Sequence, residues 1–122
     1  MKVKIDTKEK FHVITLEEEH FSAIMTEDVS KLLLSYLTAD VKNVVLKFGA
    51  VKEIDSQAAE ELLALQQTFY DNNCSFVICE LQSPVEKFLD KNEWLEMMNV
   101  TPTESEAWDI VQMEEIEREL YN

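Results

Sequence analysis

The chain has 122 residues, 46% of them hydrophobic and 30% charged, and its 25 acidic residues against 11 basic ones give a net charge of −14. These values argue against a disordered or repeat-built chain and indicate one domain, residues 1–122, able to bury a core of its own. The negative charge would repel phosphate backbones and anionic lipid surfaces. We therefore expect neither nucleic acid nor a membrane as a partner.

The N-terminal residues alternate charged and apolar side chains, which predicts a first strand and not a signal peptide. No apolar run reaches the length of a membrane-spanning helix. Cys74 and Cys79 lie on or beside a predicted strand and are an odd number of positions apart, so their side chains should point to opposite faces. We expect two separate thiols and a cytoplasmic location.

The first half of the chain predicts two paired strands and then alternating helices and strands. The strands lie over residues 2–6 and 10–16, a helix opens at residues 26–28, a strand covers residues 43–48, and a second helix starts near Asp55. Apolar side chains recur at helical spacing on both helices, at Val29, Leu32, Leu33, Tyr36 and Leu37 on the first and at Ala58, Leu62, Leu65 and Phe69 on the second.

The second half predicts an interior strand and two capped helices. Residues 75–81 are apolar on both faces, as in a strand with neighbours on each side. Ser83, followed by a proline and a glutamate, has the pattern of a helix N-cap, and Thr103 with Glu106 forms a capping box. The side chains expected to point inward are Val85, Phe88 and Leu89 on the first helix and Ala107, Ile110, Val111 and Ile116 on the second.

Several classes of chemistry lack the residues they need. The single glycine, Gly49, cannot build a glycine-rich phosphate loop, and His12 and His20 lack the ligand spacing of a zinc site. No nucleophile, base and orienting group can be assembled from the motifs present. We expect no cofactor, no metal and no enzymatic activity.

Two groups of residues suit either an ordinary structural role or a partner surface. The cluster of Trp94, Met97 and Met98, together with Trp108, suits core packing or exposed contacts to a partner. The acidic residues of the last helix suit a solvated face or contact with a basic protein. The sequence leaves both alternatives open.

Asp55 and Ser56 lie where a predicted strand passes into a helix. Either side chain could cap the helix, a contribution of about 1 kcal/mol. Alternatively, Ser56 could accept a phosphate, which would add a charge of about −1.5 to −2 beside Asp55, Glu53 and Glu60. Such a charge could leave the fold intact and still prevent docking of a partner.

The order of these segments resembles a STAS domain of the anti-sigma factor antagonist type. The residues that carry the resemblance are the apolar run 44–46, Ile54-Asp55-Ser56 at a helix start, the strand 76–79 and the Ser-Pro helix start of residues 83–89. The resemblance implies an α/β fold, with a mixed four- to five-stranded sheet and about four helices largely on one side.

The resemblance also implies a partner switch. In that family the unphosphorylated antagonist binds an anti-sigma factor that is a serine kinase using ATP, and a phosphatase reverses the phosphorylation. Carried over by residue, Ser56 is the phosphorylation site, and Asp55, Ser56 and Gln57 are partner-binding residues. The alternative is a STAS scaffold or ligand-sensing module that assembles with other STAS proteins, in which Ser56 only caps the helix.

One segment departs from the family pattern. The family continues after the serine with a Ser-Gly-Leu-Gly-like stretch, where this chain has Gln57, Ala58, Ala59 and Glu60. The loss of glycine adds side chains where a partner backbone would approach.

Overall fold

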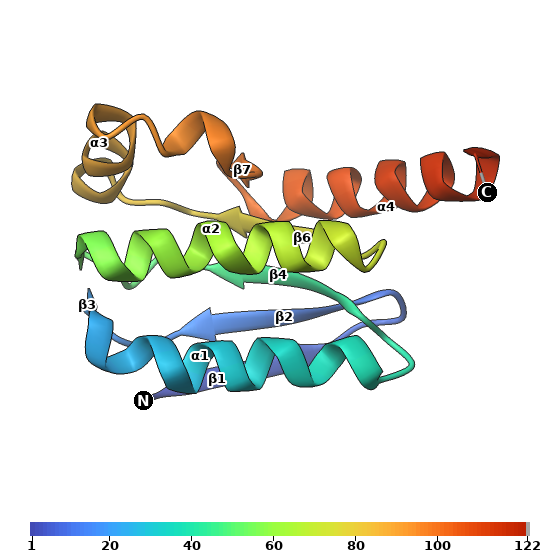
Figure 1. Cartoon of the computed structure of the whole chain (residues 1–122), viewed down its shortest axis with the longest axis horizontal. Coiled ribbons are helices and arrows are strands. Elements are labelled where there is room, and N and C mark those ends of the chain that lie inside the picture. The colour runs from blue at the N-terminus through green and yellow to red at the C-terminus, as the bar shows by residue number, and fades with distance from the viewer. Residues whose placement is uncertain (122) are drawn as a thin grey trace.

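A five-stranded mixed sheet forms the centre of the computed structural model, which describes residues 1–121 (Figure 1). The strand order is β1-β2-β4-β6-β7, with β1 antiparallel to β2 and every other pair parallel. The strands are β1 (Val3–Thr7), β2 (Phe11–Leu16), β4 (Asn43–Lys47), β6 (Phe76–Cys79) and β7 (Val100–Thr101). The expected mixed sheet, the pairing of the first two strands and the interior position of β6 are confirmed.

Two further strands form a small parallel pair outside the main sheet. β3 (His20–Phe21) pairs with β5 (Glu53–Ile54), and Phe21 lies opposite Ile54 in the register. This pair places the segment that precedes α1 beside the segment that precedes α2. The starts of the two helices are therefore neighbours.

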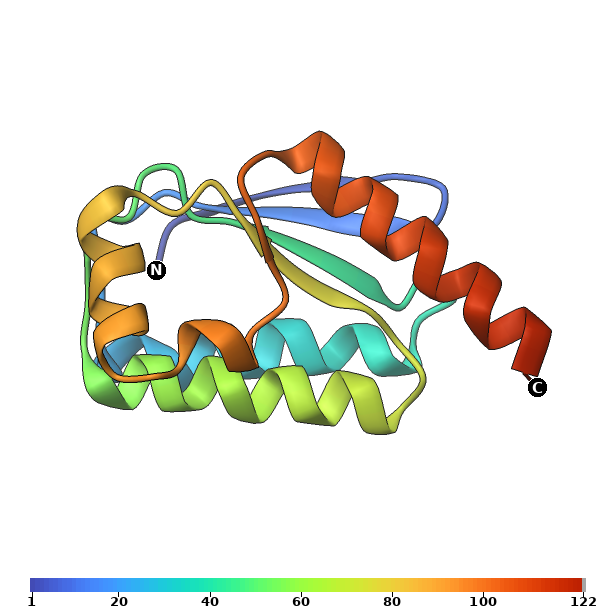
Figure 2. The ribbon, with the colours of Figure 1, turned by 90° about the horizontal axis from the view of Figure 1, so that it is seen from above.

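The helices cover the sheet unequally. α1 (Ala23–Ser35) and α2 (Ser56–Asp71) lie side by side on one face, and α4 (Glu104–Tyr121) crosses the other face (Figure 2). α3 (Ser83–Lys91) packs into the same core as α1 and α2 through Val85 and Leu89. Two short 3-10 helices, η1 (Tyr36–Thr38) and η2 (Leu95–Met97), complete the elements. The prediction that the helices lie largely on one side is thus confirmed, with α4 as the exception.

Alternation along the strands divides the buried residues between two cores. On β6, Phe76 and Ile78 face the large core beneath α1, α2 and α3, whereas Val77 and Cys79 face the small core beneath α4. Cys74 belongs to the large core, and both cysteines are free thiols. The prediction of two separate thiols on opposite faces is confirmed.

Three predicted details of the helices are wrong. α1 begins at Ala23, three residues before the expected Thr26. The N-cap position of α3 is held by Gln82, so Ser83 is the first residue of that helix. Ile116 is 56% exposed because it lies five residues beyond the buried Val111, on the side of α4 that faces away from the sheet.

The N-terminus of α4 was predicted correctly. The Thr103 hydroxyl accepts a hydrogen bond from the Glu106 backbone N–H at 3.2 Å and donates to the Glu106 carboxylate, also at 3.2 Å. The first bond is the N-cap half of a capping box, whereas the Glu106 carboxylate accepts from the Thr103 hydroxyl in place of the Thr103 backbone N–H.

The Trp and Met cluster divides between the core and the surface. Met98 is buried and Trp94 packs against the large core, whereas Met97 is 62% exposed. Trp108 is half exposed and lies against Phe11, with ring centroids 5.8 Å apart. Among residues 1–121, no helix is long and apolar enough to cross a bilayer.

Candidate functional site

The candidate site lies where β5 passes into α2. Ile54 is buried in the large core, and the backbone of Asp55 remains extended, with φ −96° and ψ 172°. The backbone N–H of Asp55 donates to the Phe21 carbonyl at 3.2 Å, which ties the junction to β3. The start of α2 is therefore held to the segment that leads into α1.

The carboxylate of Asp55 caps two helices. Its Oδ1 accepts from the backbone N–H of Ala58 at 2.8 Å, as an N-cap does, and its Oδ2 accepts from the backbone N–H of Ala23 at 2.9 Å. Ala23 is the first residue of α1. Ser22 holds the N-cap position of that helix, but its side chain makes no capping hydrogen bond. The backbone N–H groups at a helix start have no acceptor within the helix. Asp55 thus supplies the acceptors for one such N–H at the start of each helix.

Ser56 is exposed at the first position of α2 and has no part in the cap. The sequence could not decide which of the two residues caps the helix, and the structure assigns that role to Asp55. Gln57 is also exposed, so the three residues expected to form the partner-binding surface lie together at the solvent-facing start of the helix.

The departure from the family's glycine-containing stretch adds less to the surface than the sequence implied. Ala58 and Ala59 are fully buried in the large core, so their methyl groups face inward. Gln57 and Glu60 are exposed, and they line a hollow between the first turns of α1 and α2 together with Ala23. Of the four residues, only Gln57 and Glu60 add side chains to the surface.

The surface around Ser56 is acidic. Asp55 precedes it, Glu60 follows on the next turn, and Glu53 lies on β5 within hydrogen-bonding distance of the His20 ring, at 3.0 Å. The nearest lysine in the sequence, Lys52, pairs with Glu19 at 3.3 Å. A phosphate on Ser56 would be attracted by the free N–H groups of the helix start and repelled by these carboxylates.

The histidines have structural partners. The imidazole of His12 is buried, bonds to the Thr7 hydroxyl at 2.9 Å and to the Val41 carbonyl at 2.8 Å, and stacks on Tyr36 with centroids 3.9 Å apart. Within residues 1–121, no group of three His, Cys, Asp or Glu residues is placed to hold a metal ion.

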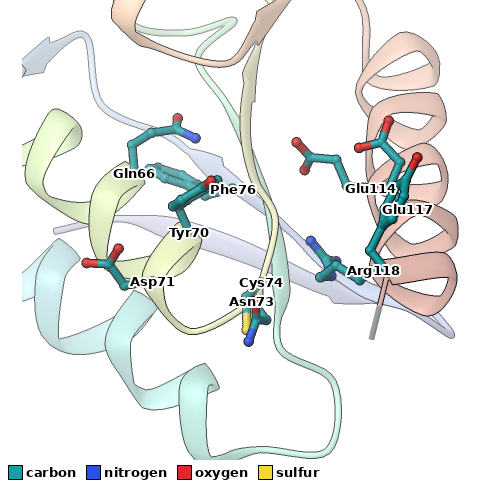
Figure 3. Close-up of a pocket in the computed structure, with 10 residues that line it drawn as sticks. Gln66, Tyr70, Asp71, Asn73, Cys74, Phe76, Glu114, Glu117 and Arg118 are labelled. Carbon is teal, nitrogen blue, oxygen red and sulfur yellow. The ribbon is translucent and has the colours of Figure 1, made fainter.

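A cleft of about 490 Å³ lies at the opposite end of α2, between that helix and α4. Gln66 and Tyr70 on α2 face Glu114 and Arg118 on α4 across it (Figure 3). Its other lining residues are Asp71, Asn73, Cys74, Phe76, Glu117 and Tyr121. The sequence did not indicate this cleft, because its residues come from two distant segments, 66–76 and 114–121, and form no local pattern.

The α4 side of the cleft is anchored by a polar network around Arg118. Its guanidinium donates to the Ser75 hydroxyl at 3.2 Å, to the Glu115 carboxylate at 3.3 Å and to the Asn43 side-chain oxygen at 3.4 Å. Asn43 is buried and also accepts from the Ser75 backbone N–H at 2.8 Å. These bonds connect α4 to the N-terminal ends of β4 and β6.

Solved structures with this fold include three bacterial proteins. An anti-sigma-factor antagonist STAS domain protein from Planctomyces limnophilus superposes with a TM-score of 0.76 at 15% identity, over 90% of this chain and 97% of that one. A serine-to-glutamate variant of RsbS from Moorella thermoacetica gives 0.74 at 17% identity, over 92% and 96%.

The third protein is the anti-sigma factor antagonist SpoIIAA, which was solved in two states. Its unphosphorylated form gives a TM-score of 0.71 at 17% identity, over 91% of this chain and 96% of that one. Its phosphorylated form, from Bacillus, gives 0.66 at 15% identity, over 90% and 99%. These likenesses establish a shared fold.

The sequence comparisons identify the family. The search of curated proteins found no significant match. The family model described as "STAS domain" matches residues 2–107, a range that includes β1 to β7 and α1 to α3. The chain belongs to the STAS domain family.

Proposed function

We propose that the protein is a non-enzymatic signalling module of the anti-sigma factor antagonist type, switched by phosphorylation of Ser56. The bare surface of Asp55, Ser56 and Gln57 binds an anti-sigma factor that is a serine kinase. Phosphorylation of Ser56 releases that partner, and a phosphatase restores binding.

The observation that carries the proposal is the division of roles between Asp55 and Ser56. Asp55 caps α2, so the fold makes no demand on the Ser56 hydroxyl, which is exposed at the first position of the helix. A kinase can reach such a hydroxyl without unfolding the helix. The scaffold alternative assigned the cap to Ser56, and the structure removes that part of it.

Charge explains how a single phosphate could act as a switch. The phosphate would add about −1.5 to −2 to a surface that already has Asp55, Glu53 and Glu60. Within the protein, the positive end of the α2 dipole offsets part of the repulsion. A partner that buries the bare hydroxyl must instead desolvate the phosphate, so docking is lost while the fold remains.

The comparisons support the proposal by analogy. Proteins of this fold include SpoIIAA, solved in phosphorylated and unphosphorylated forms, and a serine-to-glutamate variant of RsbS. At 15–17% identity these structures share the fold with this chain. The argument for Ser56 therefore depends on its own position and exposure.

The test is a pull-down from a lysate of the native organism, with mass spectrometry of the retained proteins. The baits are the wild type, Ser56→Ala, Ser56→Glu and Ser83→Glu. Ser83 is a matched control, because it is also an exposed serine at the first position of a helix. We expect a kinase-like anti-sigma factor on every bait except Ser56→Glu.

A second step tests the modification itself. The captured kinase is incubated with ATP and either the wild type or Ser56→Ala, and the phosphorylated residue is located by mass spectrometry. We expect phosphate on Ser56 of the wild type and none on Ser56→Ala. If Ser56→Glu retains the kinase as well as the wild type does, the switch is disproved; recovery of only the same STAS proteins on all baits supports a scaffold instead.

A further inference from the structure

The outer face of α4 has an exposed apolar stripe that no element within residues 1–121 covers. Met113, Ile116 and Leu120 are spaced by three and four residues, so they lie along one side of the helix. Their exposed fractions are 58%, 56% and 72%. We call these three residues the outer stripe.

The packing of α4 does not account for the outer stripe. The helix attaches to the sheet through Ala107 and Val111, which are fully buried in the small core. Its C-terminal half continues past the sheet, and the match to the STAS family ends at residue 107 (Figure 2). The stripe therefore belongs to a segment beyond the part of the chain that defines the family.

The charges beside the outer stripe are of one sign. Asp109, Glu117 and Glu119 are exposed on the same helix. The single basic residue of α4, Arg118, points instead toward the sheet, where it bonds to Ser75, Asn43 and Glu115. The outward surface of the helix is thus apolar and acidic.

The cleft between α2 and α4 adjoins this surface. Glu117 lies next to Ile116 in the sequence and also lines the cleft, together with Glu114 and Asp71 (Figure 3). The exposed rings of Tyr70 and Tyr121 lie at its rim. Carboxylates and aromatic faces are the groups that accept lysine and arginine side chains.

We propose that the outer stripe and the adjoining cleft bind a basic amphipathic helix of a partner protein. The apolar side of that helix would cover Met113, Ile116 and Leu120, and its lysine or arginine side chains would reach Glu114 and Glu117. Helices pack in this way when apolar faces meet and the flanking charges are complementary. A second copy of this chain is a poor occupant, because it would bring acidic flanks and a further net charge of −14 against the same surface.

This surface is separate from the Ser56 site. Ser56 is the first residue of α2 and the cleft lies at the other end, and a helix of 16 residues is about 24 Å long. The two surfaces can therefore bind different partners at the same time. The proposal is independent of the switch, and Ser56→Glu should leave it unchanged.

The test measures binding of a fluorescent amphipathic peptide of leucine and lysine, about 18 residues long, by anisotropy in about 0.15 M salt. The full chain is compared with a triple variant, Met113→Ser, Ile116→Ser and Leu120→Ser. The matched control is Ile24→Ser, Leu34→Ser and Met97→Ser, which removes three exposed apolar side chains elsewhere. We expect the outer-stripe variant to weaken binding by at least about tenfold and the control to match the wild type.

A second comparison separates docking from simple charge attraction. A peptide of the same composition, scrambled so that its leucines no longer form one face, should bind at least about tenfold more weakly. Glu114→Gln with Glu117→Gln should also weaken binding of the amphipathic peptide. Circular dichroism confirms that each variant is folded.

Three results would overturn the proposal. The first is equal binding of the amphipathic and scrambled peptides, and the second is unchanged binding by the outer-stripe variant. The third is a dimer of the wild type in sedimentation that the outer-stripe variant abolishes, since the occupant would then be a second copy.

Discussion

Asp55 and Ala23, 32 residues apart in the sequence, are joined by a 2.9 Å hydrogen bond from the Ala23 backbone N–H to a carboxylate oxygen of Asp55. The other oxygen of the same carboxylate caps α2 through Ala58 at 2.8 Å. One side chain thus fixes the relative position of two helix starts beside Ser56. This arrangement predicts effects of substitution that a residue with a single capping role would not have.

Replacing Asp55 should destabilise the fold more than the loss of one ordinary cap. Asp55→Ala removes the acceptors for Ala58 and Ala23, so we expect a loss of about 1–3 kcal/mol in the free energy of unfolding. Asp55→Asn keeps only one acceptor oxygen and should lose less. Urea unfolding measures both, with Asp6→Asn as the control for an exposed aspartate. If Asp55→Ala costs no more than Asp6→Asn, the double cap does not contribute to stability.

Ser56→Ala should leave stability almost unchanged. The hydroxyl does not cap α2 and the side chain is exposed, so we expect a change below about 0.5 kcal/mol in the free energy of unfolding. Thr103→Ala, which removes a hydroxyl that does cap a helix, should cost about 0.5–2 kcal/mol and serves as the comparison. A loss at Ser56 equal to that at Thr103 would mean that Ser56 has a structural role.

The long elements of the fold could be predicted because their patterns are local. Alternation identified β1, strand-like patterning identified β2, and helical spacing identified the buried faces of α1 and α2. The three strands β3, β5 and β7 have two residues each, too few to show a period. The start of α1 was placed too late because its capping acceptor, Asp55, comes from a distant segment.

The candidate site was only partly predictable for a related reason. The Asp55-Ser56 pair was visible in the sequence, but both residues are competent caps, and only the position of Ala23 shows why the longer carboxylate side chain is used. Ile116 was placed in the core wrongly, because its spacing of five residues from Val111 turns its side chain away from the buried face of α4. Arg118 could not be placed because its partners, Asn43 and Ser75, lie far away in the chain.

Replacing Arg118 should destabilise the fold more than replacing a surface cation. Arg118→Met removes the guanidinium that donates to Ser75, Asn43 and Glu115 in a partly buried network. We therefore expect a loss of about 1–3 kcal/mol in the free energy of unfolding. Lys31→Met breaks the exposed pair with Glu27 and should cost at most about 1 kcal/mol. Equal losses in urea unfolding would contradict a structural role for the network.

Stability should fall as the pH rises above about 9, in part because of Cys79. Burial, reinforced by the charge of Glu80, raises the pKa of this thiol from 9.0 to about 12. Between these values the unfolded chain loses the proton while the folded protein retains it, so the free energy of unfolding decreases with pH. Lys47, whose pKa is raised chiefly by its hydrogen bond to Glu104, also favours the folded protein until the pH exceeds the ordinary lysine value.

The contribution of Cys79 can be isolated by comparing the wild type with Cys79→Ala in urea at several pH values between about 8 and 10. The variant should be less stable at every pH, because it leaves a small cavity in the core beneath α4. Lys47 keeps its partners Glu104 and Glu80 in both proteins, so most of its contribution cancels in the difference between them. We expect this difference to shrink as the pH rises, and a constant difference would show that Cys79 ionises as easily in the folded protein as in the unfolded chain.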